Sequence, residues 1–191
     1  MRRVRQEVRV TACGRVRVAV RRRSASRADA RAVLRDLLAD ATEVAGDAEI
    51  ATRPSGQPHL PAHPEISVSL SDDGDWLAAA VGVGGRVGVD VQRPEPVTAG
   101  RLRRCGSPTA RVALAALPDP EREREYSRIW TVQEACVKAT GTGLAGRPWT
   151  IPVEVGQHDG TWHSLCWHSV PLPDIAVSVA HELRYPEREA R

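Results

Sequence analysis

The segment Glu121–Ala139 constrains the fold most strongly, because its apolar residues recur at helical spacing over the longest such stretch of the chain. One stripe of this predicted helix is apolar and consists of Ile129, Val132, Cys136 and Ala139. Gly141 and Gly143 follow, and glycine commonly ends a helix because it adopts a left-handed backbone conformation without strain. We therefore expect a long helix in the second half of the chain.

Short segments of alternating apolar and polar residues predict strands on both sides of this helix. The predicted strands lie in a hairpin within Val4–Val20 and in Ile66–Leu70, Trp76–Val83, Arg86–Val91, Ile151–Val155, Trp162–Trp167 and Ile175–Ala180. Two more helices are predicted, one capped by Ser26 and running to Leu38, the other over Thr109–Leu117. A Pro-rich junction near Arg93 indicates two halves, 1–94 and 95–191, so the predicted class is α+β.

The composition indicates a globular protein. At 191 residues, 41% hydrophobic and 27% charged, the chain can bury a substantial core. Its basic start, Met1–Arg5, is followed by alternating Val and Arg, and no apolar run reaches membrane-spanning length. We expect a soluble, cytoplasmic protein. The four cysteines are widely separated without a CxxC pair, which argues against a zinc site or a disulfide framework.

The basic residues are unevenly placed. The formal net charge is only +3, but arginine is concentrated in Met1–Arg35 and Arg101–Arg111. Such clusters suit anionic partners, although arginines on solvated faces need no partner. Lys138 is the single lysine of the chain. A compact ammonium at this one position indicates a specific point-charge contact.

An acidic residue interrupts the valine-rich strand Arg86–Val91. The valines share one face of the strand, so Gly88, Asp90 and Gln92 share the other. An aspartate between valines needs a partner, which is a backbone donor, a cation in a structural salt bridge, or a metal ion. Gly88 leaves room for another group to approach the strand.

Trp130, Glu134 and Lys138 form a second stripe of the long helix. An isolated Glu–Lys pair at this spacing is usually a solvated surface pair. The surrounding string, Trp130-Thr-Val-Gln-Glu134-Ala-Cys-Val-Lys138-Ala-Thr-Gly141-Thr-Gly143-Leu144, resembles the signature W-(T/S)-x-x-E-A-x-x-K-x-x-G-x-G-L of the 4′-phosphopantetheinyl transferase superfamily.

Three further elements agree with this resemblance in their order along the chain. Val87-Gly88-Val89-Asp90-Val91 resembles the family's (I/V)-G-(I/V)-D-(I/V)-E, Gly56-Gln-Pro-His-Leu60 its G-K-P-x-(I/L), and Ser67-Val-Ser69-Leu70-Ser71 its N-(I/L)-S-H-S segment. The chain length is similar to the larger, surfactin-synthetase-activating type, which serves peptide and polyketide synthesis. That type implies a pseudo-dimeric fold of two similar α+β halves, each with an antiparallel sheet and a long helix.

The resemblance implies an enzyme of the holo-[acyl-carrier-protein] synthase type. Such an enzyme moves the phosphopantetheine arm of coenzyme A onto a serine of an acyl or peptidyl carrier protein and releases adenosine 3′,5′-bisphosphate. Asp90, Gln92 and Glu134 would bind Mg²⁺, which prefers oxygen ligands. Glu134 would also assist removal of the serine proton, and Lys138 would hold the diphosphate, so Asp90, Glu134 and Lys138 are the expected catalytic residues.

By the same resemblance, Arg23, Arg27 and Ser69 would bind the 3′-phosphate of coenzyme A, and His59 would lie near the adenine. The chain also departs from the family pattern. Leu70 replaces a histidine, Gln57 a lysine, Gln92 the second acid of the strand motif, and Ala110 an acid of many relatives.

The expected partners are coenzyme A and a carrier protein, with no role for nucleic acid or membrane. We expect a monomer, because two internal halves supply the interface that smaller relatives obtain by oligomerising. One alternative, motivated by Gln57, Leu70 and Gln92, is a degenerate family member that binds coenzyme A or carrier protein without turnover. Another is a basic nucleic-acid-binding protein, but the chain lacks a recognised module of that kind and is poor in aromatic residues that could stack on bases.

Overall fold

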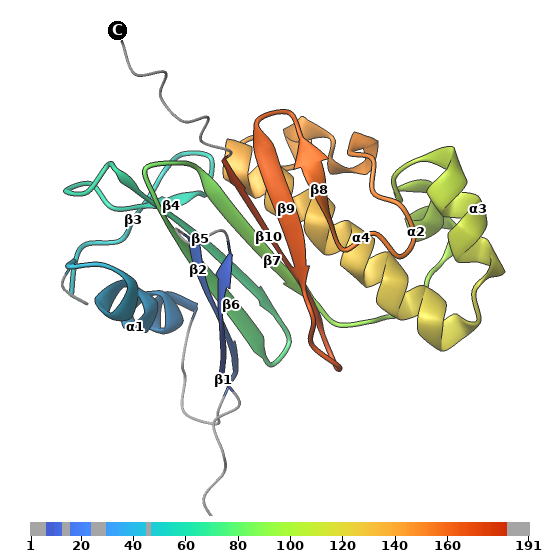
Figure 1. Ribbon diagram of the computed structural model, residues 1–191, viewed down its shortest axis with the longest axis horizontal. Coiled ribbons are helices and arrows are strands. Elements are labelled where there is room, and N and C mark those ends of the chain that lie inside the picture. Colours follow the sequence, from blue (N-terminus) through green and yellow to red (C-terminus); the bar gives the residue numbers. More distant parts are fainter. Residues whose placement is uncertain (1–6, 13–15, 24–29, 45–46, 183–191) are drawn as a thin grey trace, which may run out of the picture.

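The computed structural model describes residues 7–12, 16–23, 30–44 and 47–182. Within these ranges the chain forms two four-stranded antiparallel sheets, a two-stranded sheet and four α-helices. Helices α1 and α4 lie on opposite sides of the two large sheets (Figure 1). The predicted α+β class is confirmed. No helix in these ranges is both long and apolar enough to cross a membrane.

The first sheet has the strand order β1-β2-β6-β5. Its strands are β1 (Glu7–Ala12), β2 (Val16–Arg22), β5 (Ile66–Asp73) and β6 (Trp76–Val83). Helix α1 (Ala30–Ala41) packs on one face of this sheet through its buried Val33, Leu34, Leu37 and Leu38. Between α1 and β5, the chain forms a small hairpin of β3 (Ala51–Thr52) and β4 (Pro58–His59), which the sequence did not predict.

The second sheet has the strand order β7-β10-β9-β8. Its strands are β7 (Val87–Gln92), β8 (Asp159–Trp162), β9 (Leu165–Val170) and β10 (Ala176–Glu182). The predicted long helix is confirmed as α4 (Asp119–Thr140), which packs on this sheet and ends at Gly141 with a φ of 71°. The shorter helices α2 (Ala99–Arg103) and α3 (Pro108–Ala116) precede it.

Two strand predictions in the second half are wrong. The segment 151–155 forms no strand, and Ile151 and Val153 are instead buried in the core beneath α4. Alternation there reflects burial against the helix rather than strand pairing. The predicted strand Trp162–Trp167 is a hairpin, in which β8 ends at Trp162, His163 turns with a φ of 51° and β9 begins at Leu165.

Valines of β7 face the first sheet and pack with buried Val18, Ala78 and Ala80. Because β7 pairs with β10, it belongs to the second sheet although it precedes residue 94. The division at residue 94 stays a prediction, as does a pseudo-dimeric relation between the halves. Their helices differ in length, with 12 residues in α1 and 22 in α4.

Side chains of β5 join β7 to the first sheet. The hydroxyl oxygens of Ser67, Ser69 and Ser71 accept hydrogen bonds from the backbone N–H groups of Val87, Val89 and Val91, at 3.1, 3.0 and 3.4 Å. Asp73 Oδ2 accepts a fourth, from Arg93 N, at 2.6 Å. We call these four contacts the side-chain ladder. Each donor lies 20 residues after its acceptor, so β5 and β7 run parallel, and polar side chains satisfy N–H groups of β7 that backbone pairing leaves free.

The backbone of α4 touches β7 at Gly88. A Cβ at this position would lie 2.0 Å from the Ala135 carbonyl oxygen and 2.5 Å from the Ala139 nitrogen. The room that the sequence predicts at Gly88 is therefore filled by the helix backbone, which brings the polar stripe of α4 beside β7.

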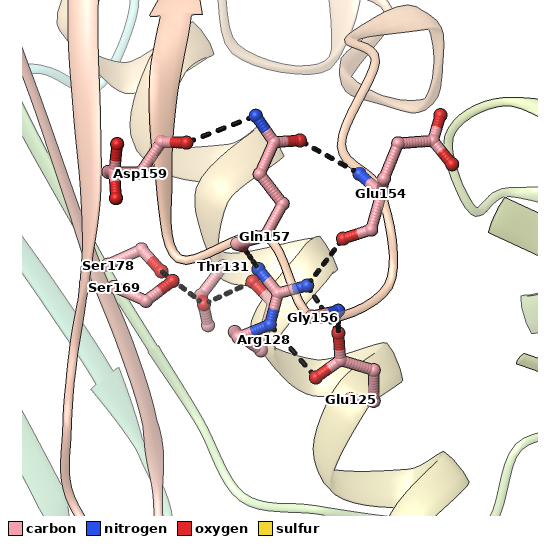
Figure 2. A network of polar contacts seen from close by, with 9 residues as sticks. All are labelled: Glu125, Arg128, Thr131, Glu154, Gly156, Gln157, Asp159, Ser169 and Ser178. Atoms are coloured by element: carbon pink, nitrogen blue, oxygen red, sulfur yellow. Dashed lines mark hydrogen bonds and ion pairs between the residues drawn. The ribbon is translucent and has the colours of Figure 1, made fainter. Parts of the chain in front are cut away.

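A buried arginine holds the N-terminal half of α4 against a neighbouring loop (Figure 2). Arg128 lies on α4 and donates to both carboxylate oxygens of Glu125 and to the carbonyl oxygens of Glu154 and Gln157. Although burial acts to raise the pKa of Glu125, the Arg128 guanidinium and the Gly156 N–H outweigh it and hold that pKa below its ordinary value. Arg128 thus ties the helix to the 154–157 loop.

One turn further along α4, a threonine connects the helix to the sheet. Thr131 Oγ1 donates to the Arg128 carbonyl oxygen and lies 2.9 Å from Ser178 Oγ of β10 (Figure 2). Ser178 is the register partner of Asp90. The network therefore sets the height of α4 on the sheet at the level of Asp90.

Replacement of Gly88 by alanine is expected to destabilise the protein by about 3 kcal/mol or more, at the upper end of overpacking costs, because two backbone segments cannot move apart locally. Urea unfolding followed by circular dichroism measures this. Gly100→Ala is the matched control, since an added Cβ there makes only ordinary contacts in α2 and should leave stability unchanged or slightly raised. Equal stability of the two variants would contradict the close helix–strand contact.

Replacement of Arg128 by methionine should lower the free energy of unfolding by about 3 kcal/mol, the lower end of the range for buried ion pairs, because the half-buried Glu125 carboxylate loses its cation and two loop carbonyls lose a donor. The exposed Arg124, on the same helix, provides the control Arg124→Met, for which a change within about 0.5 kcal/mol is expected. Thermal or urea unfolding of both variants checks the difference. A small effect at Arg128 would show that the network does not hold the helix.

Candidate active site

Three polar side chains from different elements converge where α4 lies on β7. Asp90 Oδ1 accepts a hydrogen bond from Ser71 Oγ and another from Lys138 Nζ, both at 2.7 Å. Lys138 Nζ also lies 3.4 Å from the Leu70 carbonyl oxygen. The predicted Asp90 and Lys138 are thus in direct contact, and β5 contributes a hydroxyl that the sequence reasoning did not assign.

Asp90 is buried, with 7% of its surface exposed. Burial raises the pKa of its carboxyl above the ordinary value, and the charge and hydrogen bond of Lys138, the Ser71 hydroxyl and the Val91 N–H offset only part of that effect. The ionised form of Asp90 is therefore only partly stabilised, and further positive charge nearby would stabilise it more.

Glu134 lies one helical turn before Lys138 and is half-buried. Burial and then the negative charge of Asp90 raise the pKa of Glu134, against the opposing effect of Lys138. Glu134 therefore lies within electrostatic reach of Asp90, although their positions are 44 residues apart in the sequence (134 minus 90).

The charges of this cluster do not balance. Asp90 and Glu134 carry two negative charges when ionised, and Lys138 supplies one positive charge. Gln92 is the next residue after Asp90 on the same face of β7 and is half-buried. Two carboxylates with unmet charge and a neighbouring amide fit the oxygen-ligand preference of Mg²⁺.

A cavity of about 540 Å³ lies beside the C-terminal end of α4. Its lining includes Gln57, Pro58, His59, Ser67, Arg86 and Thr140. The Nδ1 atom of His59 is buried and has no hydrogen-bond partner among the described residues. An unpaired buried ring nitrogen needs a partner, which a bound polar ligand or a water can provide.

Gln57 binds the end of α4 rather than projecting freely into this cavity. Its side-chain amide donates to the Lys138 carbonyl oxygen at 3.2 Å, and its Oε1 atom lies 3.0 Å from the position of a Cβ on Gly141. Gln57 thereby adds a second donor to the Lys138 carbonyl oxygen, which also accepts from the Gly141 N–H at 3.1 Å. The β3–β4 hairpin is tied in this way to the turn that carries Lys138.

The other predicted cofactor-binding residues are not brought together here. Arg23 is exposed, and its guanidinium lies 3.4 Å from the Asp72 carboxylate. Ser69 is buried, with 4% of its surface exposed, and its hydroxyl is a rung of the side-chain ladder. Arg27 lies outside the described residues. Of this predicted group, only His59 lines the cavity.

Sequence reasoning missed Ser71 and the helix contact of Gln57. A signal for the serines was present, because Ser67, Ser69 and Ser71 alternate with the apolar Val68 and Leu70 along one strand. Small hydroxyls at every second position of a buried strand indicate a face that meets hydrogen-bond donors. Nothing in the local sequence indicates which donors these are.

Part of the chain is similar to a known family. Residues 86–178, which include Asp90, Glu134 and Lys138, match the model of the 4′-phosphopantetheinyl transferase superfamily. The chain is 29% identical over 90 residues to a 4′-phosphopantetheinyl transferase of Bacillus subtilis, covering 47% of this chain and 40% of that protein. It is 25% identical over 99 residues to 4′-phosphopantetheinyl transferase Sfp of Bacillus subtilis strain 168, covering 52% and 44%.

A third relative is 4′-phosphopantetheinyl transferase HetI of a Nostoc species, 32% identical over 79 residues, with coverage of 40% and 33%. The matched region is thus less than half the length of each of these relatives. Together the matches show that the segment carrying the polar cluster is similar to the 4′-phosphopantetheinyl transferase superfamily.

Proposed function

We propose that the chain as a whole is a 4′-phosphopantetheinyl transferase, which moves the phosphopantetheine arm of coenzyme A onto a serine of an acyl or peptidyl carrier protein. The observation that carries the proposal is the contact between Asp90 and Lys138, with Glu134 one helical turn away and within electrostatic reach of both. The cavity begins at Ala139 and Thr140, directly after Lys138. The names of the relatives and the match over residues 86–178 support it.

In the proposed reaction, the serine oxygen of the carrier protein attacks the phosphorus that bears the pantetheine arm. A bond between this oxygen and the phosphorus forms, the bond to the bridging diphosphate oxygen breaks, and adenosine 3′,5′-bisphosphate leaves. The serine proton must be removed as the bond forms. Two like-charged phosphates must also be neutralised for the attack to occur.

Each residue of the cluster suits one of these needs. Glu134 accepts the serine proton, and its raised pKa makes it a stronger base than an ordinary glutamate. The Lys138 ammonium, a compact point charge, stabilises the bridging oxygen as the bond to phosphorus breaks. Asp90, Glu134 and Gln92 would hold Mg²⁺, which supplies charge neutralisation at the diphosphate when bound.

A second candidate is a protein that binds coenzyme A or carrier protein without turnover. Of the positions that motivate it, Gln57 lines the cavity without adding positive charge, whereas Ser69 is part of the side-chain ladder and Leu70 is apolar. Neutral residues at these positions favour weaker binding of coenzyme A than basic residues would, although Arg53 and Arg86 also line the cavity. Three properties stay predictions: the holo-[acyl-carrier-protein] synthase type, the monomeric state and the cytoplasmic location. The similarity to the relative named Sfp favours a subtype other than the holo-[acyl-carrier-protein] synthase type.

The test is incubation of the protein with an apo carrier protein, coenzyme A and Mg²⁺, followed by intact mass measurement of the carrier. One phosphopantetheine group should be added by the unchanged protein. Glu134→Gln, Asp90→Asn and Lys138→Met should each lower the rate by about a hundredfold or more, because each removes a group that acts in the transition state.

Glu121→Gln, on an exposed position of the same helix, is the control that should keep full activity. Absence of transfer to several peptide, polyketide and fatty-acid carriers, combined with measurable carrier binding by calorimetry, would select the second candidate. Full activity of Glu134→Gln would remove the assigned proton acceptor.

A further inference from the structure

Ser71 differs from the other rungs of the side-chain ladder because it reaches the proposed site. Its hydroxyl accepts from Val91 N, as Ser67 and Ser69 accept from their partners, but it also donates to Asp90 Oδ1 at 2.7 Å. The residue is buried, with 9% of its surface exposed. The buried Ser71 hydroxyl therefore links the side-chain ladder to the buried Asp90 carboxylate.

We propose that Ser71 is a positioning residue that fixes the orientation of the Asp90 carboxylate for a divalent cation. The inference rests on the proposed function for its chemical context, but it concerns metal binding and is testable without transfer. Strand β5 thereby orients the Asp90 carboxylate, a role that none of the predicted site residues supplies.

The direction of the hydroxyl proton follows from its partners. A serine hydroxyl has one proton to donate. Because the oxygen of Ser71 receives the N–H of Val91, its single proton is left for Asp90. Oδ1 of Asp90 is thus held by a donor on a buried strand, and the direction of Oδ2 is fixed with it.

Lys138 also holds Oδ1, but it is a poorer anchor. Its side chain is 29% exposed, whereas that of Asp90 is 10% exposed, and a lysine stem has several freely rotating bonds. In the proposed reaction the ammonium contacts the diphosphate, which weakens its hold on Asp90. Ser71 then remains as the donor that keeps the carboxylate in place.

Hydrogen bonds from outside the ligand set commonly change metal affinity, because they orient the ligands and set their basicity. We expect Ser71→Ala to weaken Mn²⁺ binding by about tenfold or more, in the range that loss of such a contact produces. Ser71→Thr, which keeps the hydroxyl, should bind Mn²⁺ within about threefold of the unchanged protein.

Ser69→Ala is the matched control for stability. Ser69 is also buried on the same strand and accepts the equivalent N–H of Val89, so Ser69→Ala removes one contact of the side-chain ladder and leaves Asp90 untouched. Both alanine variants should lower the unfolding midpoint, and Ser71→Ala should lower it more because it also removes the hydrogen bond to Asp90. Only Ser71→Ala should change the Mn²⁺ dissociation constant.

The measurement is a Mn²⁺ titration of the full chain in the absence of coenzyme A, with free Mn²⁺ read by electron paramagnetic resonance. Ser71→Cys keeps a side chain of similar size between β5 and β7 but is a weaker hydrogen-bond donor. This variant should also bind Mn²⁺ more weakly, and it provides the test if Ser71→Ala does not fold. Equal Mn²⁺ affinities for the Ser71 and Ser69 variants, or no Mn²⁺ binding by the unchanged protein, would overturn the inference. Mn²⁺ binding that depends on Ser71 in a protein without transfer activity would uphold it and refute only the proposed function.

Discussion

The side-chain ladder between β5 and β7 is the contact on which the rest of the structure depends. Strand β7 uses one edge to pair with β10 and turns the other toward Ser67, Ser69, Ser71 and Asp73. Backbone N–H groups that would be costly to bury unpaired thereby find acceptors without a continuous backbone ladder. The two sheets can pack their valine faces together while β7 stays beside both. Asp90 is carried on this central strand.

The close contact at Gly88 then determines what stands beside Asp90. Because the helix backbone meets the strand there, the stripe of α4 that follows is held next to the carboxylate. Arg128 fixes the other end of the contact through the 154–157 loop, and Gln57 binds its C-terminal turn. Packing removes water from both acids of the resulting site, and this burial raises their pKa values. A divalent cation would stabilise their ionised forms, for which Lys138 supplies only one positive charge.

The sequence predicts well those features that depend on local pattern. Helix α4, its glycine end and the strand that carries Asp90 follow from periodicity. The motifs single out Asp90 and Lys138 as site residues, but their direct contact is seen only in the structure. The segment 151–155 was misjudged because burial under a helix produces the same alternation as a strand. The contacts of Ser71 and Gln57 could not be foreseen. They join residues 19 to 81 positions apart, and their partners are set by how the sheets and the helix pack.

We propose that Asp90 and Glu134 together bind a divalent cation that meets the diphosphate of coenzyme A. A crystal structure of the protein with coenzyme A and Mn²⁺, with manganese located by its anomalous scattering, is the decisive experiment. One manganese ion should be bound by both carboxylates and by oxygens of the diphosphate, with Lys138 in contact with the same diphosphate. Manganese bound without Asp90 and Glu134, or a diphosphate lying away from Lys138, would contradict it.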